Sequence, residues 1–261
     1  MRVSAVLVVG LLAVTAGCSK TALPETHAPS HPTTTTKLTA APVAPDARIG
    51  ALFLGAGDLH TCTAGVLHSK DGDLILTAAH CVAGGVDTTF VAGFSGAADP
   101  SDVWRVDSIY LDPRWVTNQD PLADFAILRV AHDGAGTLED TAGGGLTIGA
   151  APKPGTVVNV TGYGLGVGGG PVGCKSATEL APGGFPSLPC GGLVDGTSGA
   201  PWTMEPAGSI VSGLTGGLDG GGCDESVSYS PPFDDGVVAL LARAEAGGPG
   251  DEAPAVFDDD C

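Results

Sequence analysis

The chain of 261 residues contains 42 glycines and only 5% aromatic residues, a composition more typical of a turn-rich β protein than of a helical bundle. Eleven Lys and Arg residues stand against 29 Asp and Glu residues, which gives a formal net charge of −18. Such a surface repels polyanions, so nucleic acid and anionic lipid head groups are excluded as partners.

The first 18 residues predict an export signal. Arg2 provides a positive start, and residues 3–14 form an apolar run that is too short for a stable membrane anchor. Residues 14–18 (Val-Thr-Ala-Gly-Cys) resemble a bacterial lipobox, apart from a threonine where leucine is usual. We expect a lipid on Cys18 that ties the exported protein to the outer face of the bacterial cytoplasmic membrane. Cleavage after Ala16 is the alternative.

The rest of the chain divides into three parts. Residues 19–46 are rich in Pro and Thr, which predicts a disordered tether. Residues 47–247 are expected to form the folded domain, and residues 248–261 form an acidic tail that we expect to be disordered apart from its cysteine.

Short β-type runs separated by turn residues predict an all-β domain with one helix at its end. The helix is expected over residues 235–246, where apolar side chains recur at helical spacing. The glycine-rich residues 133–145 are expected to connect two halves. The expected strands are residues 51–54, 62–68, 74–77, 88–94, 103–111, 125–130, 156–162, 200–204 and 209–215.

Three segments carry the side chains that a serine hydrolase needs. Ser198 lies between glycines in a predicted tight turn, which would expose its hydroxyl and aim backbone N–H groups at one point. His80 follows an apolar strand, and Asp124 opens another, with Asp120 as a second candidate carboxylate. Serine as nucleophile, histidine as base and a buried aspartate beside the histidine form a catalytic set.

These segments resemble the three signature blocks of the trypsin/chymotrypsin-like serine peptidases, in that family's order. The blocks are residues 77–81 (Thr-Ala-Ala-His-Cys), 124–128 (Asp-Phe-Ala-Ile-Leu) and 196–201 (Gly-Thr-Ser-Gly-Ala-Pro). The resemblance implies two packed six-stranded antiparallel β-barrels, over about residues 47–140 and 146–235, with the site between them. It also implies an oxyanion hole made by the N–H groups of Gly196 and Ser198.

The sequence gives less information about the specificity pocket. By the same resemblance, Ser212, Gly213 and Leu214 would line the pocket and pair with the substrate backbone. Gly192 stands six residues before Ser198, where a trypsin-like preference for Arg or Lys requires an aspartate. We therefore expect a small or medium apolar residue on the acyl side of the cleaved bond.

The seven cysteines also favour an exported protein with a lipid on Cys18, because the six that remain can pair completely. Those six are Cys62, Cys81, Cys174, Cys190, Cys223 and Cys261. The resemblance implies a disulfide between Cys62 and Cys81 that clamps the histidine turn.

The other four cysteines can pair in more than one way. Cys174–Cys190 would close the loop before Ser198 and leave Cys223–Cys261 to hold the tail, and we slightly favour this pairing. Cys190–Cys223 would instead brace the pocket.

Residues 48–50 (Arg-Ile-Gly) resemble the activation site of the animal enzymes, in which a freed isoleucine amine pairs with an aspartate just before the serine. Thr197 occupies that position here, so we do not expect this activation. The other histidines of the domain, His60, His68 and His132, have no comparable setting and are expected at the surface.

The sequence thus predicts a secreted, monomeric serine endopeptidase that acts on protein or peptide substrates without a metal or cofactor. A catalytically inactive binding module of the same fold is the alternative from another class. A serine esterase of the α/β-hydrolase fold is less favoured, because its residues run in the order Ser, Asp, His and Ala200 stands where its nucleophile turn needs glycine.

Overall fold

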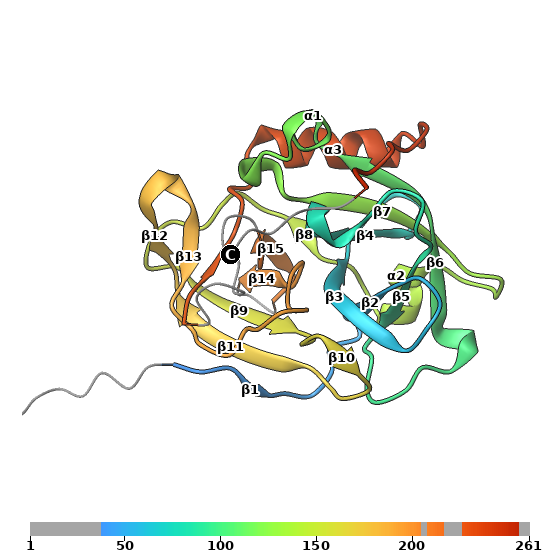
Figure 1. Cartoon of the computed structure of the whole chain (residues 1–261), viewed down its shortest axis with the longest axis horizontal. Coiled ribbons are helices and arrows are strands. Elements are labelled where there is room, and N and C mark those ends of the chain that lie inside the picture. The colour runs from blue at the N-terminus through green and yellow to red at the C-terminus, as the bar shows by residue number, and fades with distance from the viewer. Residues whose placement is uncertain (1–37, 205–207, 217–225, 256–261) are drawn as a thin grey trace, which may run out of the picture. The chain divides into compact units, whose positions relative to one another are not determined.

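The computed structural model describes residues 38–204, 208–216 and 226–255. Three α-helices within these ranges are few beside the strands, and none is long and apolar enough to cross a membrane. Figure 1 shows the strands in two groups, with α3 (Asp235–Glu245) lying across one of them.

The first group is a closed β-barrel. Its strands are consecutive in the chain, and the pairing of β3 with β4 closes the ring formed in the order β3-β2-β5-β6-β7-β4. Its interior is filled by fully buried apolar side chains such as Leu52, Leu76 and Phe90. The six strands are β2 (Ile49–Leu54), β3 (Leu59–Val66), β4 (Leu74–Thr77), β5 (Thr88–Ala92), β6 (Val103–Leu111) and β7 (Ala126–Ala131).

The second group is a six-stranded sheet in the order β1-β11-β9-β14-β15-β8, beside a small sheet in the order β12-β13-β16. Within the described ranges no pairing closes the larger sheet into a ring, as the β3–β4 pairing does for the first group. The larger sheet comprises β1 (Ala41–Pro42), β8 (Thr147–Ile148), β9 (Val157–Gly162), β11 (Val172–Ala177), β14 (Pro201–Met204) and β15 (Ile210–Leu214). The smaller sheet comprises β12 (Glu179–Leu180), β13 (Pro186–Leu188) and β16 (Ser228–Tyr229), and β10 (Gly166–Val167) extends the first barrel by pairing with β3.

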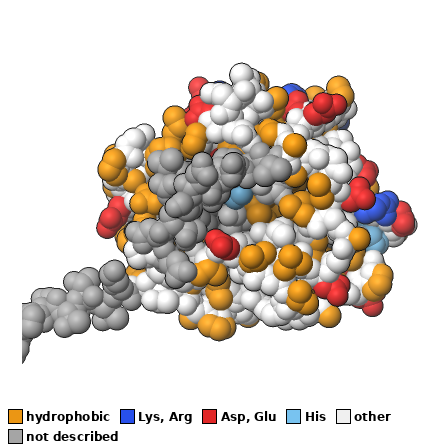
Figure 2. Space-filling view, viewed as in Figure 1, with side chains coloured by type: hydrophobic (Ala, Val, Ile, Leu, Met, Phe, Trp, Pro, Cys, Tyr) orange, Lys and Arg blue, Asp and Glu red, His pale blue; other side chains and the backbone are white. Residues whose placement is uncertain are grey.

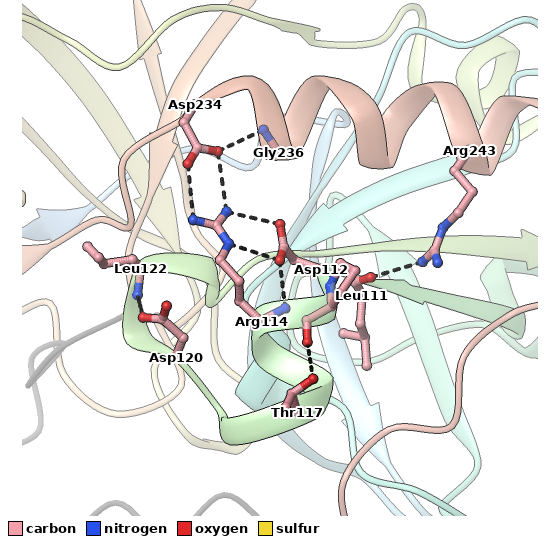
Figure 3. Close-up of polar contacts among 10 residues, drawn as sticks. Leu111, Asp112, Arg114, Thr117, Asp120, Leu122, Asp234, Gly236 and Arg243 are labelled. Carbon is pink, nitrogen blue, oxygen red and sulfur yellow. Dashed lines mark hydrogen bonds and ion pairs between the residues drawn. The ribbon is translucent and has the colours of Figure 1, made fainter.

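Two short helices were not expected from the sequence, α1 (Pro113–Asn118) and α2 (Leu138–Ala142). Asp112 caps α1, because its carboxylate accepts from the Arg114 N–H at 2.8 Å, and the proline at the first helical position fits the helix without losing a hydrogen bond. The Arg114 guanidinium also reaches Asp234, the capping residue of α3, and so joins the two helices (Figure 3).

Both boundaries of the folded domain differ from the expectation. Ala41 and Pro42 pair with β11, and the Ala40 N–H donates to Gly191 O at 2.7 Å, so the domain includes the end of the expected tether. Residues 248–255 of the acidic tail also pack on the domain, because the Asp251 N–H donates to Ile109 O at 2.7 Å and Ala253 is buried. In both places, backbone hydrogen bonds to neighbouring strands hold a segment that has few apolar side chains to bury.

Candidate active site

Strand pairing brings the histidine turn to the first aspartate candidate. β4 runs antiparallel to β7, with Thr77 opposite Ala126, so the end of β4 lies at the beginning of β7. His80 follows β4 in the turn η1 (Ala79–Cys81), and Asp124 precedes β7 by two residues. Two residues that are 44 positions apart therefore meet at one end of the barrel.

Asp124 holds His80 through two contacts. One carboxylate oxygen accepts from the His80 backbone N–H at 2.9 Å, and the other lies 2.8 Å from ring Nδ1. The Asp124 side chain is 1% exposed and the His80 side chain 19% exposed. An ionised carboxylate only accepts hydrogen bonds, so Nδ1 carries the ring proton and Nε2 of the neutral ring keeps the lone pair of a base.

The expected disulfide between Cys62 and Cys81 is present, and it ties the residue after His80 to β3. The two sulfur atoms lie close to a ring nitrogen of His80, which would suit a metal ion if the thiols were free. Since the sulfurs are bonded to each other, they are not thiolate ligands, and this group does not fit a metal.

The turn that carries Ser198 packs against the same strands. The Thr63 N–H on β3 donates to Ser198 O at 2.8 Å. A Cβ atom added to Gly199 would lie 2.1 Å from Thr63 O and 3.0 Å from Ala78 N, two residues before His80. Only glycine fits at this position, and its φ of +82° is one that other residues rarely adopt.

The backbone around Ser198 is held through its carbonyl groups. Four donors fix the four carbonyls from Asp195 to Ser198, so each of these peptide planes has a set direction. The donors are Leu165 N to Asp195 O at 2.6 Å, Thr63 Oγ1 to Gly196 O at 3.1 Å, Ala200 N to Thr197 O at 2.9 Å and Thr63 N to Ser198 O at 2.8 Å.

Some N–H groups of the same loop donate to backbone carbonyls, and others have no acceptor among the described residues. Thr197 N–H donates to Val194 O at 3.0 Å, and Gly199 N–H donates to Thr215 O at 2.6 Å. The N–H groups of Gly196 and Ser198 have no acceptor among the described residues. These are the two donors for which the family resemblance implied an oxyanion hole, and an incoming oxyanion would satisfy them.

The isoleucine and the residue before Ser198, which form the activation pair of the animal enzymes, make other contacts in this protein. Thr197 is fully buried, and its hydroxyl donates to Val194 O at 2.7 Å, which closes the turn without a charge. Ile49 lies inside β2, is 3% exposed and donates its N–H to Asp46 O. Thr197 and Ile49 therefore each make hydrogen bonds within the fold that do not involve the other residue.

The expected pocket residues are buried in the structure. Ser212 and Leu214 are both fully buried in β15, where Ser212 Oγ donates to Trp202 O and Leu214 packs in the core of the first barrel. Gly213 is paired with Trp202 in the sheet. Gly216, two residues after β15 ends, lies beside the buried aspartate, because a Cβ atom there would lie 3.2 Å from Asp124 Oδ2.

A second disulfide joins Cys174 on β11 to Cys190 before the Ser198 turn, as the favoured pairing expected. It excludes the alternative Cys190–Cys223. The expected Cys223–Cys261 bond, like the expected lipid on Cys18, falls on residues outside the described ranges.

The other histidines differ in their surroundings. His60 was expected at the surface and is 3% exposed, because its ring packs against Phe53, Phe94 and Tyr163. Its Nε2 lies 2.8 Å from Gly168 O. The exposed His68 ring lies 2.6 Å from a Glu139 carboxylate oxygen, which raises the pKa of His68.

Three residues that hold the site were missed by the sequence analysis: Thr63, Leu165 and Gly216. Thr63 and Leu165 act on partners 133 and 30 positions away, and nothing in their local sequence marks them. Asp120, the second candidate carboxylate, accepts from the Leu122 N–H and caps the turn before Asp124.

Solved structures with the same fold include a protease called Anisep from Arthrobacter nicotinovorans, at 20% identity and a TM-score of 0.69 over 80% of this chain and 100% of that one. A thermostable serine protease, AL20, from an extremophilic microorganism is similar at 19% identity and a TM-score of 0.66, over 78% of this chain and 99% of that one. Human heparin binding protein is similar at 16% identity and a TM-score of 0.60, over 82% of this chain and 99% of that one.

A comparison with curated protein sequences gave no match. The family described as trypsin-like peptidase domain matches residues 62–212, which is more than half of the 261 residues and includes all three signature blocks. The protein therefore belongs to the trypsin-like peptidase domain family.

Proposed function

We propose that the protein is a serine endopeptidase in which Ser198 is the nucleophile, His80 the general base and Asp124 the group that orients the base. The contact that carries this proposal is the 2.8 Å approach of His80 Nδ1 to the buried Asp124 carboxylate. A buried carboxylate is costly without partners, and here both oxygens meet donors of one histidine.

The reaction follows from these roles. Ser198 Oγ attacks the carbonyl carbon of a peptide bond while His80 Nε2 takes the hydroxyl proton. The carbonyl oxygen becomes an oxyanion that the N–H groups of Gly196 and Ser198 bind. His80 then gives its proton to the leaving amine as the peptide bond breaks, and an acyl-enzyme remains on Ser198. A water molecule, deprotonated by His80, attacks the acyl carbon, and Ser198 Oγ takes the proton back as the acid is released.

We further propose that the substrate is a protein or peptide cut after a small or medium apolar residue, and that the enzyme acts as a monomer outside the cell. A lipid on Cys18 would hold it at the outer face of the cytoplasmic membrane. Loss of membrane association in Cys18→Ser, measured by fractionation of expressing bacteria, would be the expected result of this part of the proposal.

The alternative is a binding module that has kept the fold and lost activity. One neighbour of this fold is named as a heparin binding protein, but a net charge of −18 disfavours a polyanionic ligand for this chain. Figure 2 shows acidic side chains spread over the viewed face and few basic ones. This distribution supports the peptidase over a module of that kind.

The deciding experiment is labelling with a fluorophosphonate probe, followed by casein hydrolysis. We expect the wild-type protein to be labelled, and Ser198→Ala to lose labelling and about 10⁴-fold or more of its turnover. Ser212→Ala is the matched control, because the Ser212 hydroxyl is buried in β15. An unlabelled wild-type protein, or labelling that survives Ser198→Ala, would reject the proposed nucleophile.

A further inference from the structure

Thr63 lies where three segments of the site cross. It is fully buried on β3, next to the disulfide-bonded Cys62. Its N–H donates to Ser198 O at 2.8 Å, and its carbonyl accepts from the Thr77 hydroxyl at 2.8 Å. One residue thus contacts both the nucleophile turn and the strand that leads to the histidine turn.

The direction of the Thr63 hydroxyl bond is fixed by its partners. The Tyr163 backbone N–H can only donate, and it lies 2.8 Å from Thr63 Oγ1, so this oxygen accepts there. The single hydroxyl proton is then donated to Gly196 O at 3.1 Å. Since Thr63 is 0% exposed, no bulk water replaces either bond.

Both carbonyls that Thr63 holds belong to the loop that presents the two unused N–H groups. The Gly196 and Ser198 carbonyls point toward β3, and this fixes the planes of the peptides that follow each residue. The N–H groups of the same two residues belong to the preceding peptides, whose orientation depends on the planes next to them. Leu165 N and Ala200 N hold the donor peptides through the Asp195 and Thr197 carbonyls, and Thr63 holds the two peptides that alternate with them. A loop released from Thr63 would keep the first two contacts and lose the restraint between its two donors.

We propose that Thr63 is a positioning residue for catalysis, which sets the direction of the oxyanion donors through the Gly196 and Ser198 carbonyls. The inference rests on the proposed peptidase function. It adds that one buried hydroxyl on the first barrel, through its bond to Gly196 O, contributes to transition-state stabilisation by a loop of the second half.

The test uses Thr63→Val, which keeps the side-chain shape and removes the hydroxyl, and Thr63→Ser, which keeps the hydroxyl. Both are made in the full chain and assayed by the rate of fluorophosphonate labelling and by casein turnover. We expect Thr63→Val to react about 10- to 100-fold more slowly at temperatures where it is fully folded. Thr63→Ser is expected to stay within about threefold of wild type, because it retains both hydrogen bonds.

The matched control is Thr61→Val, on the same strand. The Thr61 hydroxyl is buried and has no hydrogen-bond partner among the described residues, so its removal should leave the labelling rate unchanged. The pH dependence of labelling is a further readout, because it reports the ionisation of His80. A displaced oxyanion donor lowers the maximal rate and leaves the midpoint of this profile in place.

The possible results separate the two proposals. A wild-type protein that is neither labelled nor active overturns both. An active wild type with a folded Thr63→Val variant of equal rate overturns the role of Thr63 alone, as does a Thr63→Ser variant that is as slow as Thr63→Val. If Thr63→Val does not fold, Thr63→Ala replaces it with the same expected loss and the same overturning result.

Discussion

Asp124 contacts His80 through both of its carboxylate oxygens, one on the backbone N–H at 2.9 Å and one on ring Nδ1 at 2.8 Å. The first contact fixes where the turn lies, and the second fixes the ring and its tautomer. A carboxylate used in this way is both part of the fold and part of the chemistry that we propose.

Replacing this carboxylate should separate the two roles. In Asp124→Asn the amide can donate to Nδ1, which favours the tautomer with its proton on Nε2 and removes the base. We expect casein turnover to fall by about 10⁴-fold while the protein stays folded. Asp120→Asn is the control, because Asp120 caps a neighbouring turn and should retain activity. Equal losses in both variants would contradict the assignment.

Residues 248–255 of the tail should contribute to the stability of the fold through Asp251. Its carboxylate accepts from the Leu111 N–H at 2.7 Å and pairs with Arg243. Arg243 itself donates to Leu111 O, as Figure 3 shows. We expect Asp251→Ala to lower the free energy of unfolding by about 1 to 3 kcal/mol, measured by urea denaturation. Glu252→Ala is the control at an exposed neighbouring position. If the two variants are equally stable, the tail does not stabilise the barrel in this way.

The local sequence was sufficient for the strands that lead to His80 and follow Asp124, whereas the barrel and the choice of Asp124 over Asp120 came from the family resemblance. Both residues flank strands that are buried along nearly their whole length, so the apolar runs marked their positions. The antiparallel pairing of β4 with β7, which brings the two residues together, is seen in the structure.

The second half was less predictable because its order depends on backbone pairing. β1 and β10 have two residues each, and no side-chain pattern can mark so short a strand. The approach of Gly216 to Asp124 follows the end of β15 and likewise has no mark in the local sequence.

Acid should destabilise the junction between α1 and α3. Burial raises the pKa of Asp112, but hydrogen bonds and charge from Arg114 outweigh it, so this pKa lies below its usual range. A carboxylate with a lowered pKa stabilises the fold above about pH 4, and this contribution is lost as pH falls through the lowered value.

Arg114→Met removes this contribution. We expect it to cost about 1 kcal/mol at pH 7, allowing for a guanidinium that is partly exposed, and to lose less stability than wild type below about pH 4. Urea denaturation from pH 7 to pH 3 measures both effects. Arg105→Met should behave as wild type, because the Arg105 pair with Asp133 is exposed. Parallel pH profiles for Arg114→Met and wild type would refute this account.

The turn before Ser198 should tolerate no side chain at Gly196. A Cβ atom there would lie 2.1 Å from Leu165 N, the donor that fixes the preceding peptide, and the φ of +87° is unfavourable for alanine. Gly196→Ala must therefore move the loop, and we expect fluorophosphonate labelling to slow by about 10²- to 10³-fold, as when an oxyanion donor is lost. Gly164→Ala is the control on the facing segment, because its Cβ atom would meet nothing closer than Val194 at 3.4 Å. A Gly196→Ala protein that reacts as fast as Gly164→Ala would show that the donors do not depend on this turn.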